Sequence, residues 1–249
     1  MKTDIAILQR SFRLMFADPL KTLKVTSPGL AFLIGAGLLF DAQPMITAAE
    51  QRVALDPGPA IVQAIIGGVG VLLIAVYWHR YALLEGDARD QIMRPGVGVL
   101  AQYLGKLIVV FLVLLIAAIP AILLIFGTTL ILSGGSATLV IVVGVGIGIL
   151  FSWIAMRISL TLPAAALGTR LAIVDSLQAT KPLSGAILRV AVILAVMNTM
   201  LAGVITSLAA ASLAAAVVGQ LVLSYFQIIV SISVLSTLYG HLVQHRPLT

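Results

Sequence analysis

The chain alternates between long apolar runs and short polar connections. Together with their flanks, six runs are long enough to be transmembrane helices: about 28–42, 59–84, 100–126, 138–162, 186–210 and 217–243. A helix that crosses the roughly 30 Å hydrocarbon core needs about 20 mostly apolar residues. The pattern predicts an all-α polytopic membrane protein, with residues 1–249 forming a single integral membrane domain of six transmembrane helices in three hairpins.

A segment before the first run, residues 4–17, has a helical period instead of a continuous apolar run. One face carries Ile5, Leu8, Phe12, Met15 and Phe16. Arg10 and Arg13 lie on another face. Such segments are typical of the membrane interface. We predict an interfacial amphipathic helix here, ended by Asp18-Pro19 because the residue before a proline avoids the helical region.

A similar arrangement recurs along the chain. A short, partly amphipathic segment precedes Pro19, Pro95 and Pro182, and each proline is followed by a pair of apolar runs. The three pairs would enter the membrane from the same face. The pattern indicates a parallel repeat of an interfacial helix plus a transmembrane hairpin, used three times.

Charge predicts how these helices are oriented. Of the chain's residues, 61% are hydrophobic and only 10% are charged, against about 25% in a soluble domain. Fourteen of the 15 Lys and Arg residues fall on the side that holds both termini, and Arg52 alone falls on the other side. Basic loops stay cytoplasmic, so both termini are predicted to be cytoplasmic. Because the basic residues flank apolar runs, the net charge of +6 does not indicate a nucleic-acid partner.

Reactive chemistry has little support in the sequence. The absence of cysteine excludes thiolate catalysis, disulfides and Cys-ligated metal. No catalytic triad, paired carboxylates or metal-ligand cluster stands out, so we predict no enzyme, no cofactor and no metal site. An enzyme acting on lipids would need a polar cluster at the interface, such as His79 with Glu85 and Arg157.

Aromatic and basic residues mark the predicted cytoplasmic ends of the second and fourth spans. The second span ends in Trp78, His79 and Arg80, and the fourth ends in Trp153 and Arg157. Aromatic rings suit the membrane interface, and arginine can snorkel to headgroups. We interpret these five residues as candidate contacts with headgroups or with a partner.

Uncharged polar residues occur inside the last two spans. Asn198 lies near the middle of the fifth span, and Gln220, Ser224 and Gln227 share one face of the sixth. These groups need hydrogen-bond partners in lipid. They are candidates for a polar seam between the two helices. Alternatively, they line a cavity for a polar substrate.

The segment 153–185, WIAMRISLTLPAAALGTRLAIVDSLQATKPLSG, resembles the six-helix YciC-like proteins of the bacterial inner membrane. These proteins are grouped with the membrane domain of glycerophosphodiester phosphodiesterases. The catalytic domain of the larger relatives has no counterpart here. The resemblance implies a six-helix inner-membrane domain without that activity.

These observations favour a non-enzymatic bacterial inner-membrane protein that acts through contacts with membrane lipids and with a membrane-protein partner or a second copy. It would be an accessory or assembly subunit of a larger membrane complex. The alternative is a transporter or permease for a small or amphiphilic solute, with a cavity around Asn198, Gln220 and Gln227.

Overall fold

Regular structure in the described part of the chain is helical. The computed structural model describes residues 3–38, 57–86, 92–131 and 137–248, and these ranges contain no strand. Five helical segments are long and apolar enough to cross a membrane by length and composition: Gly58–Leu83, Val97–Leu124, Val142–Ala166, Ile173–Leu208 and Val217–Leu242. They correspond to the second through sixth predicted spans. The prediction of an all-helical chain suited to a membrane is confirmed.

The first predicted span, 28–42, coincides only in part with a helix. Helix α2 (Pro19–Leu38) begins well before it, and residues 39–42 lie outside the described ranges. The Asp18 carboxylate accepts a 3.0 Å hydrogen bond from the backbone N–H of Lys21, and Pro19 occupies the first helical position. The Asp-Pro pair therefore starts α2 as well as following the preceding helix.

Helices α2 and α4 (Gly58–Leu83) form the most closely packed pair. Their backbones cross at Gly29 and Gly70. A Cβ atom placed on Gly70 would lie 2.8 Å from the carbonyl oxygen of Gly29, and one placed on Gly29 would collide with the carbonyl oxygen of Gly70. Only glycine permits this approach, as at many helix crossings in membranes.

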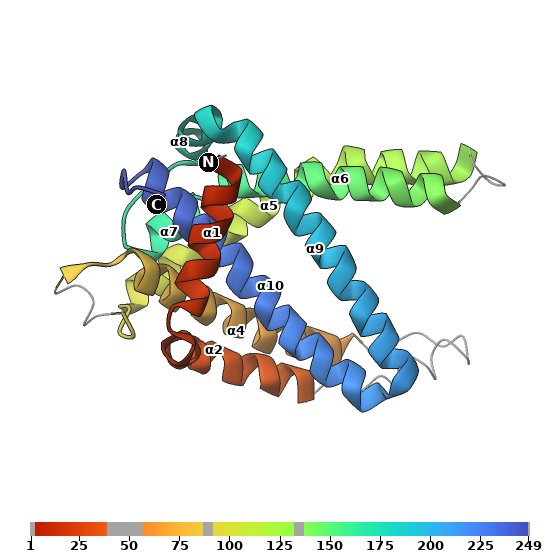
Figure 1. Ribbon diagram of the computed structural model, residues 1–249, viewed down its shortest axis with the longest axis horizontal. Helices are drawn as coiled ribbons and strands as arrows, with labels where there is room; N and C mark the ends of the chain where they lie inside the picture. Colours follow the sequence, from red (N-terminus) through yellow and green to blue (C-terminus); the bar gives the residue numbers. More distant parts are fainter. Residues whose placement is uncertain (1–2, 39–56, 87–91, 132–136, 249) are drawn as a thin grey trace.

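Helices α5 (Val97–Ile131) and α6 (Ala137–Ile158) form a hairpin that runs away from the other helices (Figure 1). Most large apolar side chains of α5 are exposed, among them Phe111 at 61% and Ile116 at 67%. The hairpin meets the rest of the chain near its base, where α5 packs against α7 and α6 packs against α9.

Helices α9 (Ser184–Ala211) and α10 (Leu213–Leu242) form the last hairpin, and α1 (Thr3–Phe16) packs against both. The predicted apolar face of α1 is buried only in part. Leu8 and Met15 are buried, whereas Ile5 and Phe16 are exposed. The side chain of Ile7, which was not assigned to that face, has no exposed surface. The buried apolar side chains of α1 therefore pack against α9 and α10.

Two short helices connect α6 to α9. Helix α7 (Thr161–Ala166) is buried along its whole length, and α8 (Ile173–Thr180) leads through the 3₁₀ helix η2 (Lys181–Leu183) into α9. The sequence did not predict α7 as a separate element, because it continues the apolar run of α6. Helix α8 coincides with the partly amphipathic segment predicted before Pro182. Small residues in α7 allow the surrounding helices to approach it closely.

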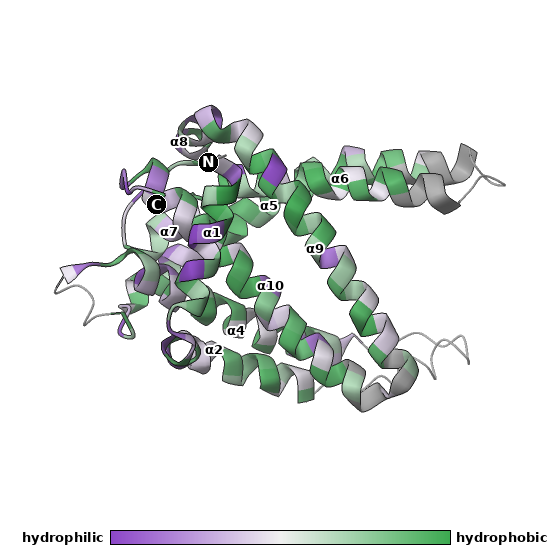
Figure 2. Cartoon of the chain, viewed as in Figure 1, coloured by the Kyte–Doolittle hydropathy of each residue, from purple (hydrophilic) through white to green (hydrophobic). Residues whose placement is uncertain are grey.

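The core lies at the end of the molecule that carries both termini, which we call the polar end. Hydrophilic residues gather there, whereas the helices extending away from it are mostly apolar (Figure 2). Its fully buried side chains include Ile7, Trp78, Leu160, Ile187 and Leu238, from α1, α4, α9, α10 and the turn before α7. Away from the polar end, α9 diverges from α6 (Figure 1). The α5–α6 hairpin therefore separates from α9 away from the polar end, whereas α9 and α10 remain in contact there.

A short helix precedes the proline in two of the three units of the predicted repeat. Helix α1 precedes Pro19, and α8 precedes Pro182. Before Pro95, the described residues 92–94 form a turn and an irregular segment, while 87–91 lie outside the described ranges. The described part of the second unit therefore has no interfacial helix.

Candidate functional site

The arginines of the polar end bind the ends of other helices. Arg80 of α4 is 6% exposed, and its guanidinium donates to the backbone oxygen of Ala166 at 3.1 Å and to that of Ile92 at 3.4 Å. Ala166 is the last residue of α7. The last carbonyls of a helix lack partners within it, so a cation at that position satisfies and stabilises the helix end.

Arg157 of α6 makes a comparable set of contacts with α8. It donates to the backbone oxygen of Leu177 at 3.2 Å and to the Thr180 hydroxyl at 3.3 Å. Its guanidinium also lies 4.9 Å from the ring centroid of Trp153, whose indole N–H donates to the backbone oxygen of Ser184 at 3.1 Å. These two side chains therefore fix the base of α6 to α8 and to the start of α9.

Arg246, in the chain after α10, binds the end of α4. It donates to the backbone oxygens of Ala82 and Leu83, at 3.1 and 2.6 Å, and forms a 3.1 Å ion pair with Glu85. The three arginines that follow the predicted hairpins thus share one role. Each one satisfies carbonyls at the end of a helix from another part of the chain.

Trp78 and His79 lie inside the bundle and have no exposed surface. The Nδ1 atom of His79 is 2.9 Å from the Ser236 hydroxyl, and its ring packs 6.1 Å from that of Tyr103. The burial of Trp78, His79 and Arg80 leaves these side chains little or no surface for the contacts with headgroups or a partner that were predicted for them. Trp153 and Arg157 remain half-buried beside α8.

The polar residues proposed for an enzyme are not brought together. His79 contacts Ser236, Glu85 pairs with Arg246, and Arg157 binds α8. In the part of the chain that the structure describes, no group of three or more His, Asp or Glu side chains is placed to hold a metal ion.

The polar residues of the last two helices separate into two groups. Gln220 donates to the Ser224 hydroxyl at 3.1 Å within α10, and Gln227 is half-buried further along the same helix. Asn198 is exposed on α9 and, in the described ranges, makes no hydrogen bond to those three residues. Asn198 lines a cavity between α9 and its neighbours, to which the other three do not contribute.

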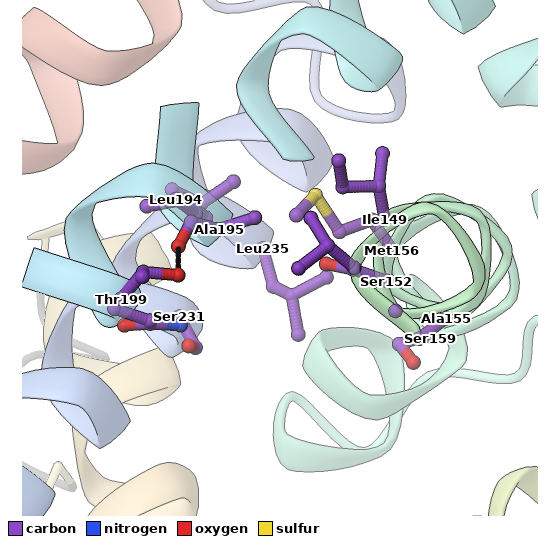
Figure 3. Close-up of a pocket in the computed structure, with 14 residues that line it drawn as sticks. Ile149, Ser152, Ala155, Met156, Ser159, Leu194, Ala195, Thr199, Ser231 and Leu235 are labelled. Atoms are coloured by element: carbon purple, nitrogen blue, oxygen red, sulfur yellow. Dashed lines mark hydrogen bonds between the residues drawn. The ribbon is translucent and has the colours of Figure 1, made fainter. Parts of the chain in front are cut away.

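That cavity, of about 400 Å³, lies between α6, α9 and α10. We call it the α6–α9 groove. Its polar lining residues are Ser152, Ser159, Asn198, Thr199 and Ser231. Figure 3 shows the side chains of α6 facing those of α9, with Leu235 of α10 between them. The sequence pointed to Asn198, and Ser231 continues the spacing of the polar face predicted on the sixth span. Ser152 and Ser159 were missed, because single serines in apolar helices are common.

Several polar contacts between distant helices were also missed. Ser11 of α1 donates to the Thr237 hydroxyl of α10 at 3.0 Å, and Thr26 of α2 lies 2.7 Å from the Tyr225 hydroxyl of α10. Asp4 of α1 forms a 2.8 Å ion pair with Arg189 of α9. The hydrogen bond from Arg189 holds the pKa of Asp4 below its ordinary value.

Comparisons with models of protein families, with curated proteins and with solved structures found no match. The resemblance of residues 153–185 to the YciC-like proteins therefore stays a prediction.

Proposed function

We propose that the chain is a non-enzymatic bacterial inner-membrane protein that acts through contacts within the bilayer. In this proposal it has six spans in three hairpins, with both termini in the cytoplasm. Its partner is another membrane protein or a second copy, and it serves as an accessory or assembly subunit of a larger complex. Lipids cover the remaining apolar surface.

The α5–α6 hairpin carries the proposal. Its base is held by Trp153 and Arg157, while the rest of α5 is exposed and α9 diverges from α6. Helices in membranes associate through close van der Waals packing and polar contacts. The α5–α6 hairpin packs against the rest of its own chain only near its base. The exposed surfaces of both helices are therefore available to pack against another membrane protein.

Photo-crosslinking from native membranes tests this function. A photoreactive amino acid at Ile116 of α5 is compared with one at Phe32 of α2, which is also an exposed apolar position. We expect one defined protein adduct at Ile116, identified by mass spectrometry and retained in mild detergent, and lipid adducts at Phe32. Lipid adducts alone at both positions, together with a monomer that purifies without protein, would overturn the proposal.

The proposed orientation rests on the charge asymmetry of the sequence. Because the chain has no cysteine, Leu248→Cys and Ser212→Cys each provide a single thiol. We expect an impermeant maleimide added to intact spheroplasts to label the variant at position 212, in the α9–α10 turn, and to leave the variant at 248 unlabelled. The reverse result would invert the orientation.

Transport is a second candidate function, favoured by the α6–α9 groove. A polar lining within spanning helices is expected on a solute pathway. The groove contains Asn198, as the transport hypothesis expected, but neither Gln220 nor Gln227 lines it. Flux that is unchanged by Asn198→Leu would count against this candidate.

A further inference from the structure

The α6–α9 groove holds polar groups that the protein itself leaves without partners. One polar lining residue, Thr199, donates its hydroxyl to the carbonyl of Ala195 one turn earlier, as Thr206 and Ser207 do elsewhere on α9. Within the described ranges, no such bond and no other hydrogen bond engages the side chains that line the groove at Ser152, Ser159, Asn198 and Ser231. These four groups come from α6, the turn after it, α9 and α10.

The unpaired groups extend from the polar end into the apolar part of the helices. Ser159 follows directly after α6, whereas Asn198 lies 14 residues beyond Ser184, which corresponds to about 21 Å along α9. At that depth a hydrocarbon environment leaves an amide unsatisfied, which is unfavourable. A polar occupant of the groove would remove this cost.

The remaining lining favours a lipid-like occupant over a free polar solute. Apolar side chains make up most of it, including Ile149, Met156, Leu194 and Leu235. Away from the polar end α6 and α9 diverge (Figure 1), and exposed side chains of the two helices there, such as Val142 and Met200, are apolar. An acyl chain can follow this apolar surface while its head remains among the serines.

Charge selects among such molecules. None of the described residues that line the groove is charged. The nearby arginines have other partners: Arg157 binds α8, and Arg189 pairs with Asp4. An anionic head would therefore lack a counter-ion, and a neutral head with hydroxyl or carbonyl groups fits the available donors and acceptors.

We propose that the α6–α9 groove binds an amphiphile with an uncharged, hydrogen-bonding head group, which enters sideways from the bilayer. Asn198 and Ser231 bind the head, and the acyl chain lies between α6 and α9. The inference deepens the transport candidate, because it names the class of molecule that the groove would accept. It concerns binding alone and does not depend on a protein partner at α5.

Photolabelling with a defined lipid tests the site. The purified protein is placed in phosphatidylcholine vesicles with a diacylglycerol that carries a diazirine in one acyl chain. A phosphatidic acid with the same chains serves as the anionic comparison. We expect the diacylglycerol to label peptides covering 145–159 and 194–199, and the phosphatidic acid to label them several-fold less. Equal labelling by both lipids, or no labelling of these peptides, would overturn the inference.

Matched variants establish that the lining is responsible. Combining Asn198→Leu with Ser231→Ala removes two hydrogen-bonding groups and should reduce labelling about tenfold. Gln220→Leu, at an exposed amide outside the groove, should leave it unchanged. Undiminished labelling of the double variant would contradict the proposed role of Asn198 and Ser231.

A second pair of variants fills the groove without removing a polar group. A Cβ atom at Gly148 or at Gly146 would meet no atom within 4 Å, so both positions accept a larger side chain. Gly148 lines the groove and Gly146 does not. We expect Gly148→Leu to abolish labelling and Gly146→Leu to preserve it; equal labelling of the two would overturn the inference. Strong, saturable labelling without movement of the lipid across the bilayer would support binding while excluding transport.

Discussion

Asp4 near the start of α1 and Arg189 in α9 form an ion pair of 2.8 Å, although 185 residues separate them in the chain. The Asp4 side chain is 6% exposed and that of Arg189 is 56% exposed. The contact attaches the amino-terminal helix to the last hairpin at the polar end. Together with the Ser11–Thr237 hydrogen bond, it makes α1 part of the bundle.

This ion pair should make the attachment of α1 depend on pH. The Arg189 hydrogen bond lowers the pKa of Asp4 below its ordinary value of 3.8, so the folded state favours the carboxylate. The resulting stabilisation is present above that ordinary value and is lost as the pH falls through the lowered pKa. We expect the thermal unfolding temperature in detergent to fall more steeply at acidic pH for the wild type than for Asp4→Asn. If the unfolding temperatures of the wild type and Asp4→Asn fell in parallel with pH, the ion pair would not contribute to stability. Arg13→Gln, which also removes a charge from α1, is the control and should keep the pH dependence of the wild type.

The crossing of α2 and α4 should tolerate no added methyl group. Gly29→Ala would place Cβ against the backbone of α4, so the helices must separate. We expect a loss of about 1–3 kcal/mol in the free energy of unfolding, as for other overpacked contacts. Gly68→Ala on α4 is the matched control, because its Cβ would meet no atom within 4 Å. Similar losses in both variants would indicate a general effect of replacing glycine in these helices.

Buried Arg80 should be more important for stability than an exposed arginine. Arg80→Leu leaves the Ala166 carbonyl without its donor, and an unsatisfied buried acceptor costs about 1–3 kcal/mol. Arg80→Lys should recover only part of the loss, because an ammonium group cannot reproduce the guanidinium fork. The measurement is unfolding in detergent, with exposed Arg94→Leu as the control. Equal stability of the Arg80→Leu and Arg94→Leu variants would contradict this role.

Sequence patterns were sufficient to predict the long helices. The spans predicted at 59–84, 186–210 and 217–243 lie close to the observed α4, α9 and α10. A long apolar run depends on local composition alone, and composition is visible in the sequence. Helix α7 was not predicted, because its six residues extend an apolar run and only their burial among other helices distinguishes them.

The environment of the polar residues could not be predicted in the same way. An arginine at the end of a span is equally compatible with a headgroup or with the end of another helix. Arg80 and Arg157 meet the ends of α7 and α8, at Ala166 and Thr180, and nothing in the sequence pairs either arginine with those residues. Likewise, Asn198 was recognisable as a single amide in a span, but its neighbours Ser152 and Ser231 come from other helices.

The base of the α5–α6 hairpin should control how far the hairpin moves relative to α9. Trp153 and Arg157 supply hydrogen bonds from α6 to Ser184 and to the end of α8. Combining Trp153→Phe with Arg157→Ala removes these bonds while keeping an aromatic ring at position 153.

Spin labels at Leu124→Cys and Met200→Cys, both exposed and in a chain without native cysteine, report the α5–α9 distance in nanodiscs. We expect the Trp153→Phe, Arg157→Ala combination to broaden the distance distribution. Exposed Arg170→Ala should leave it unchanged. An unaltered distribution in the combined variant would mean that apolar packing alone fixes the hairpin, since the hydrogen bonds at its base would then be dispensable for its position.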